Sequence, residues 1–193
     1  IVTSLGASFV SKFQQGFDPI LNLPENVGSY ALRSNLNFKG FSWTNEWAYK
    51  INDPSYDNGY IYRPGEAFIS TLTYSKKGLG ILASIKRIDN MSFRSDRNAQ
   101  QFDLFINFLP PTSEPHTYAL PALYPYATQV NGEIGSQFEI SYMIPRGSPI
   151  GGKYGTRLNF NSAISNSIDK SVLEDGTRGL KAVSYTHLTL PTI

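Results

Sequence analysis

The side chains that could perform nucleophilic catalysis are few in this chain. A Ser-His-Asp hydrolase needs a histidine held beside the serine and oriented by an acid. The sequence contains two histidines, His116 and His187, and no cysteine. His116 follows Pro115 in a loop-like stretch, and a single loop histidine is far more often structural or solvated than catalytic. We therefore expect no enzyme activity and no cofactor.

Oxygen ligands for a metal ion are suggested by Asp53 and Asp57, which share a loop with Gly59. These acids lack the regular spacing and the closing glutamate of a calcium-binding loop, and Asx turns explain both. The Gly-rich stretch 147–152 is not followed by Lys-Ser or Lys-Thr at a helix start, so it is typical of a hairpin turn rather than of a phosphate-binding loop. The lack of cysteine excludes a disulfide framework and thiolate metal sites. The sequence therefore predicts no metal site.

Binding chemistry is suggested by aromatic and charged residues. Trp43 and Trp47 could stack on a sugar in a soluble protein, but at a membrane boundary they are typical girdle residues, and the aromatic content of 13% fits both roles. The loop residues Arg94, Asp96 and Arg97 could meet a ligand, a lipid headgroup or a partner, although a solvated loop is the ordinary interpretation. The formal net charge of +2 indicates no nucleic-acid partner.

The elements that would position these residues are β-strands. Apolar and polar residues alternate over 30–39 and over 41–51, with Lys39 and Gly40 at the junction, which predicts an amphipathic hairpin. Ser34 and Asn45 interrupt its apolar side. Each run is about as long as the 9–11 residues that a tilted strand needs to cross a bilayer. No segment approaches the roughly 18 apolar residues of a transmembrane helix.

The same alternation marks about nine strands in all. We place them at 5–13, 30–38, 41–50, 68–74, 80–88, 102–108, 116–126, 138–144 and 154–160. The connections alternate between long and short, as the outer loops and periplasmic turns of a transmembrane barrel do, whereas a Greek-key sandwich has no reason to alternate. The predicted fold is all-β: an antiparallel up-and-down transmembrane β-barrel, incomplete because bacterial barrels normally have an even strand number.

In such a barrel one face of each strand contacts lipid and the other lines the lumen. Charged residues in the lumen tune what permeates, or else pair with one another across it. The lumen-lining candidates are Arg33, Glu46, Lys50, Asp103, Glu139, Lys153 and Arg157. The membrane-facing candidates are Leu32, Leu36, Phe38, Phe41, Trp43, Trp47 and Tyr49.

Several strings resemble an uncharacterised family of Gram-negative outer-membrane barrel proteins, which carries only a domain-of-unknown-function label. The strings are GSYALR at 28–33, the run 49–62 with NDPSY at 52–56, NMSFRSDR at 90–97, ALYPYA at 122–127 and GGKYG at 151–155. The resemblance implies a barrel in the outer membrane. It supplies no catalytic residue, because none is established for such a family.

The two ends suggest that the chain is a fragment. It starts at Ile1 without a basic and apolar leader, so we expect that a secretion signal lies upstream or has been removed. Residues 183–193 resemble the translation of a sequencing adapter, which predicts a non-native tail and a natural sequence that ends near Lys181. The predicted organisation is therefore a partial barrel over 1–165, an irregular segment or the start of the next barrel segment over 166–182, and the tail.

Two functional hypotheses follow from these patterns. The first is an outer-membrane β-barrel that acts as a pore, a transporter component or a surface protein, with outer-membrane lipid as its partner and an open choice of solute or surface partner. The alternative is a secreted, soluble β-sandwich that binds glycan through its aromatic residues. The two differ in what the apolar face touches, because lipid covers it in a barrel and a second sheet covers it in a sandwich.

Overall fold

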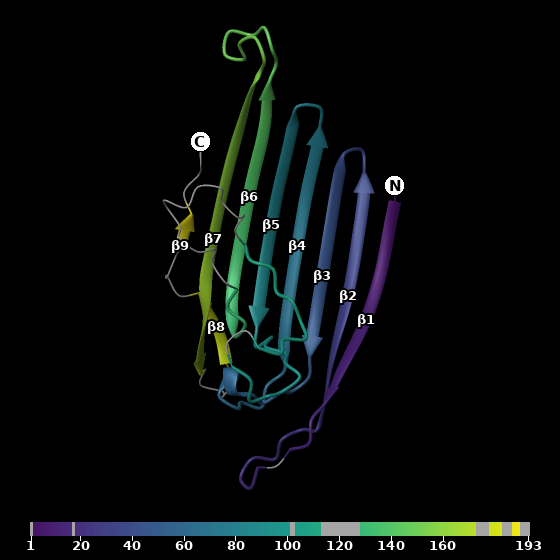
Figure 1. Ribbon diagram of the computed structural model, residues 1–193, viewed down its shortest axis with the longest axis vertical. Coiled ribbons are helices and arrows are strands. Elements are labelled where there is room, and N and C mark those ends of the chain that lie inside the picture. The colour runs from purple at the N-terminus through teal and green to yellow at the C-terminus, as the bar shows by residue number, and fades with distance from the viewer. Residues whose placement is uncertain are drawn as a thin grey trace.

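The computed structural model describes residues 2–16, 18–100, 103–112, 128–172, 178–182 and 187–189. They form an antiparallel sheet in up-and-down order, β1 to β8, with the short β9 also paired with β7 (Figure 1). The strands are β1 (Val2–Phe13), β2 (Asn26–Phe38), β3 (Phe41–Lys50), β4 (Gly65–Lys76), β5 (Leu79–Asp89), β6 (Gly132–Ile144), β7 (Thr156–Val172), β8 (Arg178–Ala182) and β9 (His187–Thr189).

The structure confirms the predicted hairpin between β2 and β3. Phe38 pairs with Phe41, and the turn consists of Lys39 and Gly40 alone. Both turn residues have positive φ, 44° and 87°, which is the backbone twist that a two-residue hairpin requires. The tight turn fixes the register, so every apolar residue of β2 stands opposite an apolar or uncharged residue of β3.

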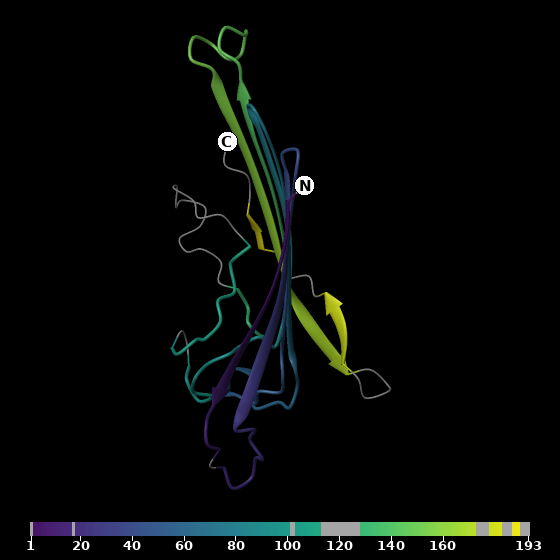
Figure 2. The same cartoon turned by 90° about the vertical axis from the view of Figure 1, so that its right-hand side faces the viewer.

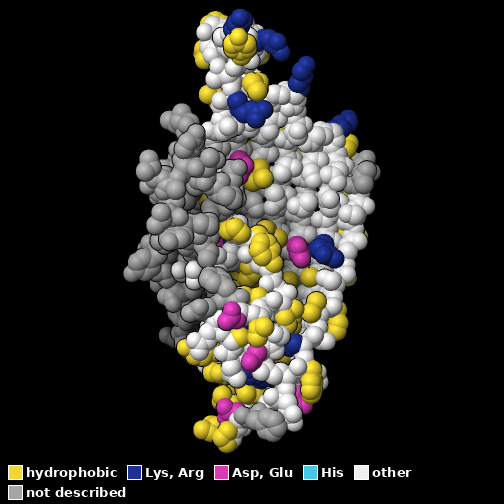
Figure 3. Space-filling model, viewed as in Figure 1, with side chains coloured by type: hydrophobic (Ala, Val, Ile, Leu, Met, Phe, Trp, Pro, Cys, Tyr) yellow, Lys and Arg dark blue, Asp and Glu magenta, His cyan; other side chains and the backbone are white. Residues whose placement is uncertain are grey.

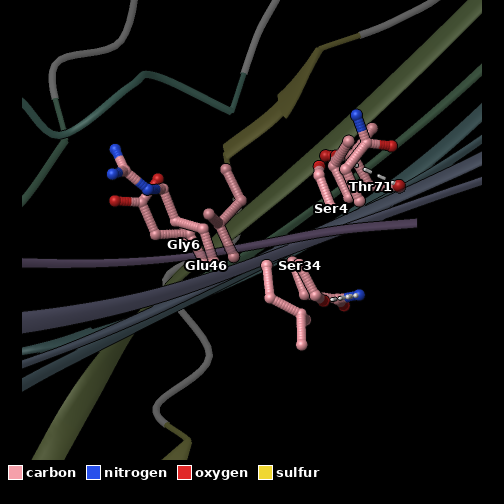
Figure 4. Close-up of a pocket in the computed structure, with 11 residues that line it drawn as sticks. Ser4, Gly6, Ser34, Glu46 and Thr71 are labelled. Carbon is pink, nitrogen blue, oxygen red and sulfur yellow. Dashed lines mark hydrogen bonds between the residues drawn. The ribbon is translucent and has the colours of Figure 1, made fainter. Parts of the chain in front are cut away.

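The register gives the sheet two chemically different faces, because directly opposed residues of an antiparallel pair point to the same side. Leu36, Trp43 and Leu72 lie side by side on the face that we call the apolar face. The other side, which carries Arg33 and Glu46, is the polar face. Figure 4 looks along the sheet and shows Glu46 and Thr71 on one side of the strands and Ser34 on the other.

The long connections fold over one end of the polar face, as the two views in Figures 1 and 2 show. Loop residues Met91 and Phe93 are buried there with Val27 of β2 and Ile88 of β5. The connection before β4 contains a short 3₁₀ helix, η1 (Tyr56–Asn58). Among the described residues, no helix has the length and apolar character needed to cross a membrane.

The predicted barrel closure is absent from the described residues. The seven long strands, β1–β7, form one sheet that is neither closed by hydrogen bonds nor strongly curled. Within this part of the chain, β1 pairs only with β2, so its outer edge has no strand partner. The established architecture is thus an open, all-β, antiparallel sheet.

The predicted strand at 102–108 is wrong. Residues 103–108 form turns and bends, and Leu104 has a positive φ of 56°, which no extended strand contains. Phe105 forms one isolated β-bridge with Arg94. The guanidinium of Arg94 lies 3.8 Å from the centre of the Phe105 ring. The alternation therefore belongs to a loop that lies on the polar face. The predicted strand at 116–126 falls outside the described residues.

The last predicted strand differs in its bounds. It was placed at 154–160, but β7 begins at Thr156 and continues to Val172. Residues 166–172, where the periodicity fades, thus remain in the sheet. Ladder hydrogen bonds hold this stretch, because β6 and then β8 pair with it.

Candidate functional site

The open half of the polar face forms the floor of a hollow of about 370 Å³ over β1–β4 (Figure 4). Ser4, Gly6, Arg33, Glu46 and Thr71 line its polar side. Arg33 and Glu46 stand directly opposite each other on β2 and β3, where opposite charges attract. The floor is therefore hydrophilic and close to neutral.

The covered half of the polar face contains buried charges. The Nζ atom of Lys12 lies 2.9 Å from Oδ1 of Asp53, and that of Lys50 lies 3.7 Å from Oδ2. Lys50 also donates a hydrogen bond of 2.5 Å to the carbonyl of Ser92. Lys50 and Asp53 are fully buried. Because an unpaired charge is costly away from water, these contacts fasten the loop 51–64 to the sheet.

A second ion pair joins β5 to β6. The Nζ atom of Lys86 lies 2.7 Å from Oε1 of Glu133 and also donates to the carbonyl of Pro110 and the hydroxyl of Thr128, at 2.7 and 2.9 Å. An ammonium group has three donors, so all of them are used. The other oxygen of Glu133 accepts the backbone N–H of Gln129 at 2.7 Å. The loop 90–131 is thereby attached to the sheet at Pro110 and near its end, at Thr128 and Gln129.

The charged loop that includes Arg94 and Arg97 was interpreted as solvated, and this interpretation is wrong for its two arginines. Both are almost fully buried. Nε of Arg94 lies 2.8 Å from a carboxylate oxygen of Asp57. Arg97 donates to the side chain of Gln14 and, at 2.7 Å, to the carbonyl of Pro24. These hydrogen bonds offset part of the cost of burying the two guanidinium groups, and the loop packs inward.

Asp96 is the acid of this loop that stays partly exposed. Its Oδ1 accepts hydrogen bonds from the backbone N–H of Asn98 at 2.9 Å and from the amide of Gln14 at 2.8 Å. These two bonds lower the pKa of Asp96 below its usual 3.8, and the bond from Asn98 has the larger effect. Asp96 therefore stays ionised at neutral pH and holds the loop against the end of β1.

The arrangement does not favour metal binding or acid–base catalysis. Asp53 and Asp57, which could have supplied calcium ligands, are paired with lysine and arginine instead. No group of three or more metal-ligating side chains occurs among the described residues. His116 lies outside the described part of the chain. Asp53 and Asp57 therefore serve as counter-ions of buried cations.

No loop of the described residues covers the apolar face. Fifteen of its large side chains are exposed, with Leu5 at 81%, Leu32 at 55% and Leu158 at 50%. The two interruptions noted in the sequence are satisfied by neighbours: Asn45 donates to Ser34 at 3.3 Å and accepts from Ser70 at 2.7 Å. Ser70 in turn accepts the indole N–H of Trp43. These four side chains thus bond to one another across β2, β3 and β4.

Aromatic and charged groups mark the two ends of the apolar face. Phe41 and Tyr74 contact each other at a centroid distance of 4.5 Å near the tight turns. Phe9 and Tyr30 do so at 4.9 Å near the loops. Beyond the second pair lies a charged group. It consists of Glu66, Arg87, Asp89 and Arg63, joined by ion pairs, with the indole of Trp47 donating to Glu66.

The structure places the predicted site residues as follows. Arg33, Glu46, Lys50, Glu139 and Arg157 lie on the polar face. All seven membrane-facing candidates lie on the apolar face, where Leu32, Phe38, Phe41 and Trp43 are exposed and Leu36, Trp47 and Tyr49 are half-buried.

Two lumen-lining candidates do not lie on strands. Asp103 is in a turn of the loop 90–131, because the strand predicted there does not form. Lys153 is in the connection between β6 and β7, because β7 begins only at Thr156. Both side chains are exposed, so neither belongs to the polar face.

The buried ion pairs of the covered half were missed in the sequence. The sequence contains no signal for these pairs, because Lys12, Lys86 and Glu133 each match the ordinary polar positions of an alternating strand. Their polar-face position is implied by the alternation. Their partners are not, since Lys12 meets an acid of a loop after the third strand, far along the chain.

Comparisons with known proteins give one match. The model of a family described as a family of unknown function, DUF6029, matches residues 1–187. The match covers β1 to β8 and extends over residues 183–187 of the segment predicted to be adapter-derived. No curated protein and no solved structure matches the chain.

Proposed function

Since the chain belongs to the family of unknown function DUF6029, which assigns it no activity, we propose from its two-faced sheet that it forms part of the wall of an outer-membrane β-barrel. In this proposal the apolar face contacts lipid and the polar face lines the interior. The barrel acts as a pore, a transporter component or a surface protein. No cofactor and no catalytic residue is required.

One observation carries the proposal: among the described residues, the long loops cover one half of the polar face and none of them covers the apolar face. A water-soluble protein gains free energy by covering its apolar surface, and large exposed apolar patches mark contact with a membrane or another protein. Here charged residues such as Lys50 and Lys86 are buried while Leu32 and Phe138 are exposed. That inversion suits a protein whose apolar side is in lipid and whose polar side is enclosed.

The dimensions of the apolar face support the same function. The stretch of β2 from Tyr30 to Phe38 has nine residues, within the roughly 9–11 residues that a tilted strand needs to cross a bilayer. Aromatic residues lie at both ends of that stretch, as they do in interfacial girdles. The internally bonded line from Ser34 to Ser70 avoids unsatisfied polar groups in lipid.

The proposal sets a condition on the edges of the sheet. Lipid contains no partner for free N–H and C=O groups, so the outer edge of β1 must pair with a further strand once the protein is in a membrane. That strand can come from a longer chain or from a second copy. The loops on the polar face favour an interior that is narrowed by the protein itself.

The glycan-binding sandwich has weaker support. It requires a second sheet on the apolar face, and the described strands form one sheet. Its two tryptophans are also engaged, because the indole of Trp43 donates to Ser70 and that of Trp47 donates to Glu66. A sugar could therefore stack on either ring but could not accept a hydrogen bond from its N–H group.

Membrane fractionation tests the proposal. The expressed protein should sediment with outer membranes and should migrate differently on a denaturing gel before and after boiling, because a closed ladder resists detergent until it is heated. Leu36→Arg, on the apolar face, should reduce membrane assembly, since an arginine facing lipid near the midplane costs about 2–4 kcal/mol. Asn35→Arg, on the neighbouring residue of the polar face, should assemble normally. Recovery of the protein in a detergent-free soluble fraction would reject the proposal.

A further inference from the structure

The end of the sheet that lies opposite the long loops carries only positive charge among the described residues. It consists of the connections 39–40, 77–78 and 145–155 with the strand residues beside them. Figure 3 shows lysine and arginine side chains at this end and acidic ones only farther down. The cations of this end, which we call the basic end, are Lys39, Lys76, Lys77, Arg146 and Lys153, all of them exposed.

The charge of the basic end is not neutralised within the described part of the chain. None of the three connections contains an aspartate or a glutamate. The opposite end of the sheet, which the long loops cover, is called the loop end here. At the loop end, Lys12 is paired with Asp53 and Arg94 is paired with Asp57. The structure thus separates the loop end, where buried cations are paired with acids, from an end with five exposed cations.

The cations lie at the boundary of the apolar face. The ammonium of Lys39 is 5.1 Å from the centre of the Phe38 ring. That of Lys153 is 5.4 Å from the centre of the Tyr154 ring. Next to them, Phe41 and Tyr74 end the apolar side of their strands. Aromatic rings beside cations are typical of the headgroup level of a bilayer, where the ring meets acyl chains and the charge meets phosphate.

We propose that the basic end binds the headgroups of anionic phospholipids. This inference rests on the proposed function, because it assumes that the apolar face lies in a bilayer. A partner must match an apolar band and a row of cations on its rim at the same time. A bilayer that contains anionic lipid does both, whereas an acidic protein would match the cations alone. Each lysine that lies within about one Debye length of such a surface adds to the attraction.

Vesicle flotation tests the inference with the full chain, diluted from urea into vesicles of phosphatidylcholine alone or with about one quarter phosphatidylglycerol. The basic-end variant is Lys39→Asn, Lys76→Gln and Lys77→Gln, in which asparagine keeps the positive φ of the turn. A matched control adds three negative charges at exposed positions of the loop end, through Gln15→Glu, Asn22→Asp and Gln100→Glu.

The wild-type chain should partition more strongly into the anionic vesicles, and the basic-end variant should lose that preference by about tenfold or more, as should the wild type at high salt. The control should keep the preference. An equal loss in the control would mean that net charge alone acts, and equal binding of the wild type to both vesicles would also overturn the inference. Either result leaves the proposed function intact, whereas flotation with neither vesicle would count against the proposed function itself.

Discussion

Lys12, on the first strand, contacts Asp53, in the loop after the third strand, at 2.9 Å, and both side chains are almost completely buried. Asp53 also faces Lys50, so one carboxylate serves two lysines. An acid placed between two buried cations attaches the loop 51–64 to both β1 and β3. This attachment can be tested.

Replacement of Asp53 by asparagine should strongly destabilise the protein. The change leaves the ammonium groups of Lys12 and Lys50 buried without a counter-charge, and loss of one member of a buried ion pair typically costs about 3–5 kcal/mol. Urea unfolding followed by tryptophan fluorescence gives the free energy of unfolding. Asp18→Asn, in an exposed loop, should leave the free energy of unfolding almost unchanged. Equal effects of the two changes would show that the buried cluster does not hold the loop.

A glycine on β6 should be essential for the loop cover. A Cβ atom on Gly135 would collide with the side chain of Thr112, which packs directly on the polar face at that point. Gly135→Ala should therefore displace the loop, increase its cleavage by protease and cost about 1–3 kcal/mol. Gly80→Ala is the control, because its Cβ would meet its nearest neighbour, Ser141, at an ordinary 3.9 Å. Unchanged protease resistance in Gly135→Ala would contradict this packing.

Much of the sheet could be predicted from the sequence, because alternation and turn residues are local signals. The hairpin at Lys39 and Gly40 and the two-faced pattern both follow from them. The same local signal wrongly predicted a strand at 102–108. Alternating side chains also suit a loop that lies flat on a surface, as the contact between Phe105 and Arg94 shows.

The buried site could be predicted only in part. The polar-face position of Lys50 follows from its place in β3, but its partner does not follow from any local pattern. Arg97 was expected in solvent, because a charged loop is usually solvated. Its burial depends on acceptors at Gln14 and Pro24, which only the folded chain brings to it. Contacts over such long separations leave no periodicity in a single sequence.

Acid should loosen the contact between the loop at Asp96 and the end of β1. The folded-state pKa of Asp96 lies below 3.8, so its contribution to stability is present above pH 3.8 and is lost as the pH falls through the lower folded-state value. Hydrogen exchange at the amide of Asn98, corrected for the intrinsic rate, should accelerate over that range. In Asp96→Ala the amide should be unprotected at every pH, and in Asp103→Asn it should behave as in the wild type. Constant protection below pH 3.8 in the wild type would refute the role of Asp96.

Ion selectivity should depend on which face carries a charge, if the protein conducts in a planar bilayer. Arg157 is on the polar face, so Arg157→Glu should shift selectivity towards cations. Lys153 is exposed in the connection before β7, so Lys153→Glu should shift it less. The reversal potential in a salt gradient measures both. Equal shifts, or no shift in Arg157→Glu, would show that the polar face of β7 does not line the path.

Side-chain accessibility along β2 tests the two-faced membrane sheet most directly. The chain has no cysteine, so single cysteines can carry spin labels at successive positions of the protein reconstituted in vesicles. Labels on the apolar face should collide with lipid-dissolved oxygen, and labels on the polar face with a water-soluble nickel complex, so that accessibility alternates with a period of two. Labels on the apolar face that are shielded from both reagents would contradict the proposal, because a second layer of protein would then cover that face. The labelled positions are Leu32, Leu36 and Phe38 on the apolar face, and Arg33, Asn35 and Asn37 on the polar face.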